Sequence, residues 1–262
     1  MTRSHHGPVL VISMDLEPGR NQTSLGQKQR TDAAAAEVLS LLEGHRIPAT
    51  LGRSEPGLAD WHTERYCGTV QHEAALLGDS SWIGPEAGRA GFARELGRRV
   101  QGAREAGTVI RSLLMRDGPL RGDWDLLVKQ EIVGLRDGQL PEPRAAAGSD
   151  PRIARFGLWE MPVSCCVPTA ARWPWGDRGG WAARRAIRRA VARDHSVHIF
   201  VDLRFLAEHQ MAGLAAIHRT LHLAARLRDA GQLETLTLGD LIAQRRRRTD
   251  AAGTRSVLCP AA

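Results

Sequence analysis

The chain has 262 residues, 42% of them hydrophobic, and no apolar run reaches the roughly 18 residues of a membrane span, so we expect no membrane partner. Its formal net charge of +7 comes almost entirely from arginine, with Lys28 and Lys129 the only lysines, and no nucleic-acid-binding motif accompanies it, so we expect no nucleic-acid partner. Four cysteines without Cys-x-x-Cys spacing exclude a disulfide framework and a cysteine zinc site.

The first strand carries the most informative pattern. Residues 9–17 are an apolar, β-branched run that ends in two carboxylates, Asp15 and Glu17, before Pro18 and Gly19 break the structure. This pattern predicts a buried parallel strand. Because loops converge on a site at the carboxyl ends of parallel strands, we expect both acids to be functional rather than loop caps.

After this strand, short apolar runs alternate with segments of helical period, which is typical of βα units. The later predicted strands cover residues 47–51, 73–78, 109–115, 132–135, 158–163, 197–202 and 233–238. The predicted helices cover residues 31–43, about 85–106, 124–130, 180–193, 208–230 and 239–248, and residues 136–155 form a long loop. Seven or eight strand and helix pairs in about 240 residues fit an α/β fold of the (β/α) barrel type.

The organisation of the chain is predicted to be simple. Its length suits one hydrophobic core, so we expect a single domain over residues 1–262, with a basic C-terminal tail from about residue 245. The first seven residues lack the apolar core of a signal peptide, which predicts a cytoplasmic protein.

Several segments resemble the polysaccharide deacetylase family, also called the NodB-like carbohydrate esterases. Residues 12–17 (ISMDLE) look like the first-strand motif in its Asp-x-Glu form, and residues 72–76 (HEAAL) look like the opening of the second motif. Residues 43–50, 111–116 and 157–163 and the C-terminal helix are similar to further family segments. The resemblance implies a distorted barrel of seven or eight strands that holds a divalent metal, usually zinc, through an aspartate and a His-x3-His pair.

The metal-binding positions depart from the family pattern. The resemblance puts the two metal histidines at Leu77 and Ser81, and a late catalytic histidine at Asp202. Leucine has no donor atom and serine is a poor zinc ligand, so we expect no metal and no other cofactor. Carboxylates such as Asp15, Glu17 and Asp79 could still bind Mg²⁺ or Ca²⁺, an alternative that we consider weaker.

Without a metal, the surviving acids have to carry any chemistry. Asp15, Glu17 and Asp202 in one cleft would push their pKa values apart and supply a general acid and a general base. We therefore predict a metal-independent enzyme for hydrolysis, cyclisation, elimination or isomerisation of a small polar or amine-bearing substrate. Two alternatives remain open: a conventional metal-dependent deacetylase of N-acetylated sugars, and a non-catalytic binding protein.

Five further residues are candidates for substrate binding. Arg116 matches an arginine of the third motif and could orient Asp15 or hold a substrate carboxylate. Trp82 follows the lost second ligand and could fill the volume of metal and water. The other candidates are Glu73, Trp159 and Glu160, which lie in strands near motif positions.

Overall fold

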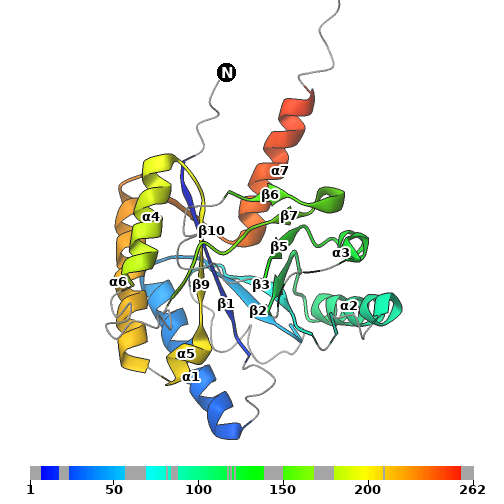
Figure 1. Ribbon diagram of the computed structural model, residues 1–262, viewed down its shortest axis with the longest axis horizontal. Coiled ribbons are helices and arrows are strands. Elements are labelled where there is room, and N and C mark those ends of the chain that lie inside the picture. Colours follow the sequence, from blue (N-terminus) through cyan, green and yellow to red (C-terminus); the bar gives the residue numbers. More distant parts are fainter. Residues whose placement is uncertain are drawn as a thin grey trace, which may run out of the picture.

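The first strand, β1 (Val9–Asp15), lies in the middle of a curled sheet that has ten strands among the described residues (Figure 1). The spatial order is β6-β7-β5-β4-β3-β2-β1-β9-β8, and β10 pairs with the amino-terminal half of β1. Neighbouring strands are parallel except β6 and β7. The computed structural model describes residues 7–17, 24–56, 69–80, 82–83, 88–116, 118, 120, 122–138, 150–167, 180–208 and 210–254.

The later strands and the helices alternate along most of the chain. The strands are β2 (Thr50–Arg53), β3 (Glu73–Gly78), β4 (Ser112–Met115), β5 (Gly134–Arg136), β6 (Arg152–Ile153), β7 (Trp159–Glu160), β8 (Cys165–Val167), β9 (Val197–Val201) and β10 (Glu234–Leu236). The helices are α1 (Leu25–Gly44), α2 (Gly88–Glu105), α3 (Trp124–Lys129), α4 (Trp181–Arg193), α5 (Leu203–Glu208), α6 (Gln210–Asp229) and α7 (Leu238–Thr254), with a short 3-10 turn at Arg155–Gly157. The predicted α/β barrel is thereby confirmed.

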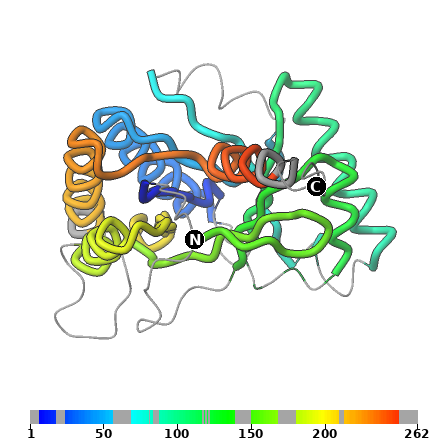
Figure 2. The backbone as a smooth tube through the Cα atoms, turned by 90° about the horizontal axis from the view of Figure 1, so that it is seen from above, coloured from blue at the N-terminus to red at the C-terminus, as the bar shows by residue number. Residues whose placement is uncertain are grey.

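The helices cover the outside of the barrel and one of its ends. Helices α1, α4 and α6 lie on one side, and α2 and α3 lie on the other (Figure 1). Seen from above, α7 lies over the middle of the barrel (Figure 2). No helix among the described residues combines the length and the apolar character that crossing a membrane requires.

Alternation along the strands divides the apolar core into two clusters. Leu10, Ile12 and Met14 of β1 face outward and pack with the helices. Val9 and Val11 face inward, where they pack with residues of β3, β4 and α7 in a separate cluster. Helix α7 thus closes the barrel at the amino ends of the strands, and its side chains Leu238, Leu241 and Ile242 are fully buried there.

Polar side chains satisfy each other at the same closed end. The two carboxylate oxygens of Glu73 accept hydrogen bonds from the hydroxyl groups of Thr50 (2.9 Å) and Ser112 (2.6 Å) and from the backbone N–H of Gly239 (2.8 Å). Burial raises the pKa of Glu73, and these hydrogen bonds oppose that shift. The carboxyl group therefore ties β2, β3 and β4 to the first turn of α7.

Several predicted boundaries differ from the structure. Helix α1 begins at Leu25 because Ser24 caps it by accepting from the N–H of Gln27, so Thr31 is a buried residue within the helix instead of its cap. Strand β8 was not predicted, since three residues are too few to show a period. Residues 245–248, where the basic tail was expected to begin, lie within α7, and Arg245 contacts Asp150 there (3.4 Å).

Candidate active site

A small cavity opens at the carboxyl ends of the central strands, and we call it the carboxyl-end pocket. It has a volume of about 60 Å³. Its lining residues come from the ends of β1, β4, β5 and β9, the residues after β4 and β5, the segment before β8, and α5: Asp15, Met115, Arg116, Arg136, Asp137, Gly138, Val163, Phe200 and Arg204. This is the end of a parallel barrel at which active sites are built.

Asp15 is the predicted acid that reaches the pocket. It follows Val11 and Ser13 on the inward face of β1, and its side chain is 11% exposed. One carboxylate oxygen, Oδ1, accepts a 2.7 Å hydrogen bond from Arg136 Nη2, and the other, Oδ2, lies 3.8 Å from Arg116 Nε. The carboxylate is therefore held in one orientation by two guanidinium groups.

The guanidinium group of Arg136, which lines the pocket, is held by several contacts. Besides Asp15 it donates to the carbonyl oxygen of Met115 (3.0 Å) and to the hydroxyl oxygen of Ser13 (3.3 Å). Its guanidinium carbon lies 4.6 Å from the ring centre of Phe200, in the range of a cation–π contact. Its side chain is only 3% exposed, so this charge is a permanent part of the barrel interior.

Below Arg136, a serine and a histidine continue the polar interior. Ser13 Oγ lies 2.8 Å from His198 Nε2, and His198 Nδ1 lies 3.3 Å from the carbonyl oxygen of Met161. Burial, with the charge of Arg136 second, lowers the pKa of His198 to about 3. The neutral ring therefore donates from Nδ1 to Met161 and accepts at Nε2 from Ser13. Arg136, Ser13, His198 and Met161 thus form a chain in which every donor points the same way.

Arg116 joins the pocket as the sequence predicted. Besides its contact with Asp15, its Nη2 atom donates to the carbonyl oxygen of Glu17 (2.9 Å). The pocket lining then carries three guanidinium groups, from Arg116, Arg136 and Arg204, and the carboxylates of Asp15 and Asp137. A negatively charged or strongly hydrogen-bond-accepting group suits this lining better than an amine.

The three predicted acids do not share this pocket. Glu17 turns toward β2, where its Oε1 atom accepts from the backbone N–H of Ser54 (2.8 Å). Asp202 caps α5 through Oδ1, which accepts from the N–H groups of Arg204 (3.0 Å) and Phe205 (3.3 Å). A capping carboxylate satisfies N–H groups that the first helical turn leaves free, so the structure gives Asp202 a structural role.

The predicted substrate-binding residues other than Arg116 also lie elsewhere. Glu73 is at the closed amino end of the barrel. Trp82 packs on Phe92 of α2, with ring centres 5.8 Å apart, and so belongs to the outer core. Trp159 packs against the inner apolar cluster. Glu160 forms two hydrogen bonds with Arg152 (2.9 and 3.0 Å) across the β6–β7 pair.

The donor set at the expected metal position does not fit zinc. Leu77 is fully buried in the inner apolar cluster, and a Cβ placed on Gly52 would meet its Cδ1 atom and Asp15 Oδ1, both at 3.5 Å. Leucine offers no donor atom, and the oxygens of Asp15 already face two arginines. Ser81 lies outside the described residues. Within the described part of the chain, no group of three His, Cys, Asp or Glu side chains could hold a metal ion.

The residues that the sequence analysis missed come from three strands, β1, β5 and β9, from the residue after β5 and from α5. They are Ser13, Arg136, Asp137, His198, Phe200 and Arg204. Alternation could have placed His198 and Phe200 inward once β9 was recognised. Arg136 comes directly after the predicted apolar strand 132–135, just as Asp15 lies at the end of the first strand. This pattern was the sequence signal that could have placed Arg136 at the pocket.

Two solved structures share this fold. A protein from Mycobacterium smegmatis that is assigned to the polysaccharide deacetylases has a TM-score of 0.64 at 14% identity, over 95% of this chain and 93% of that one. A 4-alpha-glucanotransferase from Thermococcus litoralis has a TM-score of 0.61 at 8% identity, over 91% of this chain and 40% of that one. By sequence, the chain matches no protein-family model and no curated protein. The likeness establishes a polysaccharide deacetylase-like fold.

Proposed function

We propose that this chain is a metal-independent enzyme that acts on a small polar substrate, with Asp15 as its proton-transferring group. The observation that supports this function is the placement of Asp15 in the carboxyl-end pocket, oriented by Arg136 at 2.7 Å. A carboxylate held at one position and reachable from solvent can remove a proton from a substrate and return it. Asp137, which also lines the pocket, replaces Glu17 and Asp202 as the second acid of the pair.

The size and charge of the pocket limit the substrate. A volume of about 60 Å³ admits only the reacting end of a molecule, since one water occupies about 30 Å³ of liquid. Three lining arginines favour a carboxylate, or a carbonyl oxygen that gains negative charge during reaction, over the amine that the sequence analysis suggested. Arg116 and Arg136 then act both as partners of Asp15 and as stabilisers of that oxygen.

Zinc chemistry plays no part in this proposal, because Leu77 offers no donor and the arginines engage both oxygens of Asp15.

The test uses N-acetylated amino sugars and small hydroxy and keto acids, with turnover followed by proton NMR. We expect turnover by the wild type in EDTA, a loss of about 100- to 10,000-fold in D15N, and little change in the control D202N. Turnover that EDTA abolishes and Zn²⁺ restores would identify a conventional metal-dependent deacetylase instead.

A second candidate function is non-catalytic binding of a small anion. It is favoured by the fact that both oxygens of Asp15 already face guanidinium groups, which leaves this carboxylate engaged. The two functions differ in one measurement. A binding protein retains a compound from the panel in equilibrium dialysis without converting it, and D15N binds that compound as well as the wild type does.

A further inference from the structure

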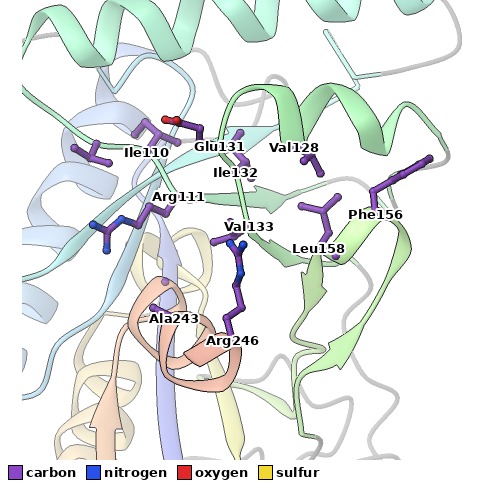
Figure 3. Close-up of a pocket in the computed structure, with 13 residues that line it drawn as sticks. Ile110, Arg111, Val128, Glu131, Ile132, Val133, Phe156, Leu158, Ala243 and Arg246 are labelled. Atoms are coloured by element: carbon purple, nitrogen blue, oxygen red, sulfur yellow. The ribbon is translucent and has the colours of Figure 1, made fainter. Parts of the chain in front are cut away.

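A second, larger cavity lies at the opposite end of the barrel, and we call it the amino-end pocket. Its volume is about 570 Å³. It lies between α7, the segments that lead into β4 and β5, and the turn at Arg155–Gly157 (Figure 3). Cavities of roughly 300 to 1,000 Å³ are typical of small-molecule sites in proteins, whereas the carboxyl-end pocket is far smaller.

Seven of the thirteen lining residues of the amino-end pocket are aliphatic. They include Ile110, Val128, Ile132, Val133, Leu158 and Ala243. Six large hydrophobic side chains are exposed among the described residues, and three of them line this pocket: Val109 (67%), Val128 (42%) and Phe156 (66%). Phe156 even adopts a left-handed backbone (φ 55°), which is unfavourable for a side chain of this size. Exposed apolar groups gathered around one cavity indicate an apolar ligand.

The charged groups of the pocket add a positive character. Arg246 extends from α7 across the pocket toward Val133 (Figure 3). Arg111 lies at the same end of β4, and neither arginine makes an ion pair within the described residues. The one lining carboxylate, Glu131, is bound to Arg104 at 2.9 Å, outside the lining. The pocket therefore presents uncompensated positive charge beside its apolar walls.

Helix α7 contacts the barrel core with one face and the amino-end pocket with another. Leu238, Leu241 and Ile242 face the barrel core. Gly239, Ala243 and Arg246 follow one another at spacings of four and three residues, which places them on one face of a helix, and all three line the pocket. The N–H of Gly239 is already bonded to Glu73, so the guanidinium of Arg246 is the group of α7 that remains for an anion.

We propose that the amino-end pocket binds an amphipathic carboxylate, with its aliphatic body against Val128, Ile132 and Leu158 and its carboxylate on Arg246. Apolar walls give such a ligand affinity in proportion to the area that is buried. The guanidinium selects the charge and fixes the orientation through charge-assisted hydrogen bonds. This site is separate from the carboxyl-end pocket and differs from it in taking a molecule with a long apolar body.

The probe is decanoate, with binding to the full chain measured by calorimetry. We expect saturable binding of one decanoate per chain, with decanol at least ten-fold weaker and decyltrimethylammonium not bound. R246Q should weaken decanoate binding about ten- to hundred-fold, as expected for loss of a charged hydrogen bond. The control R247Q changes the neighbouring arginine of α7, which does not line the pocket, and should bind as the wild type does.

Two outcomes would overturn this proposal. Equal binding of decanoate by wild type and R246Q, or equal binding of decanoate and decanol, would show that no charge-selective site exists. Failure of the wild type to bind decanoate, together with a dimer in sedimentation velocity that V128D dissociates, would assign this face to self-association. Val128 is partly exposed, so V128D is expected to fold, and its circular dichroism spectrum checks this.

Discussion

The inner face of β1 is apolar at the amino end of the barrel and polar at the carboxyl end. At the amino end, β1 contributes Val9 and Val11, and α7 fills the space with Leu238, Leu241 and Ile242. At the carboxyl end, the same face of the same strand contributes Ser13 and Asp15, and the space is filled by Arg136 and His198. Four steps along one strand thus change the interior from an apolar core to a hydrogen-bonded polar one.

This difference indicates which end of the barrel tolerates substitutions and which end suits a reactive site. The apolar cluster at the amino end gains its stability from burial, so the residues of that cluster are exchangeable for others of similar size. The carboxyl end depends on every polar group keeping its partner, because an unpaired buried charge is costly. A pocket at the polar end is lined by side chains that hydrogen bonds already hold in one orientation. Proton transfer and anion binding require such oriented groups.

The largest expected effect comes from breaking the polar end. R136M leaves the carboxylate of Asp15 without its 2.7 Å partner and Ser13 without its donor. We expect the free energy of unfolding to fall by about 3 to 5 kcal/mol, measured by urea denaturation. R204Q is the control, because Arg204 lines the same pocket but is 44% exposed. Equal stability of the two variants would show that the polar interior contributes little.

A smaller effect is expected at the apolar end. L241A removes a fully buried side chain of α7 from the inner cluster and leaves a cavity. The expected loss in unfolding free energy is about 2 to 5 kcal/mol, again from urea denaturation. L25A, at a largely exposed leucine of α1, should change it by less than about 0.5 kcal/mol. If L241A is as stable as L25A, α7 does not close the barrel in solution.

The pH dependence of stability sharpens the comparison further. The pKa of His198 is lowered from 6.5 to about 3 in the fold, so between these values the unfolded chain binds a proton that the folded chain does not. Stability from this residue is complete above pH 6.5 and falls toward pH 3, by about 1.4 kcal/mol per unit. The raised pKa of Glu73 acts in the opposite direction, so the measured quantity is the difference between wild type and H198Q. Parallel pH profiles of the two proteins would contradict this assignment.

The smallest expected effect concerns metal. Because Leu77 and the arginines around Asp15 leave no zinc donor set, EDTA should not change the melting temperature, and elemental analysis should find far less than one zinc per chain. Stoichiometric zinc that is lost together with melting temperature on chelation would instead show a ligand set outside the described residues.

Local pattern explains what could be predicted from the sequence. Residues 73–78 were predicted as a strand with the bounds that β3 has, since a compact apolar run ends at a glycine and a turn. The position of Asp15 at the mouth of the barrel followed from the same reasoning. The contact between Arg116 and Asp15 was accessible through the family resemblance.

The rest of the site depends on pairing between distant residues. Ser13 and His198 are 185 positions apart, and Arg136 and Asp15 are 121 positions apart. No local period reports such pairs. Glu17 and Asp202 each end a predicted strand but do not reach the pocket. The carboxylate of each accepts a hydrogen bond from a backbone N–H instead. Local hydrogen bonds at the start of α5 decided the role of Asp202. For Glu17 the bond comes from Ser54, 37 positions away.

The place of β1 in the sheet has a consequence for biosynthesis. β1 is the first strand in the element order of the described residues, yet two of its partners, β9 and β10, are among the last. Helix α7, which closes the interior, comes after them. A nascent chain therefore carries the apolar faces of β1 without their full cover until β9, β10 and α7 have been synthesised. Such a chain completes this fold only after α7 has emerged, and until then those faces are where a chaperone would act.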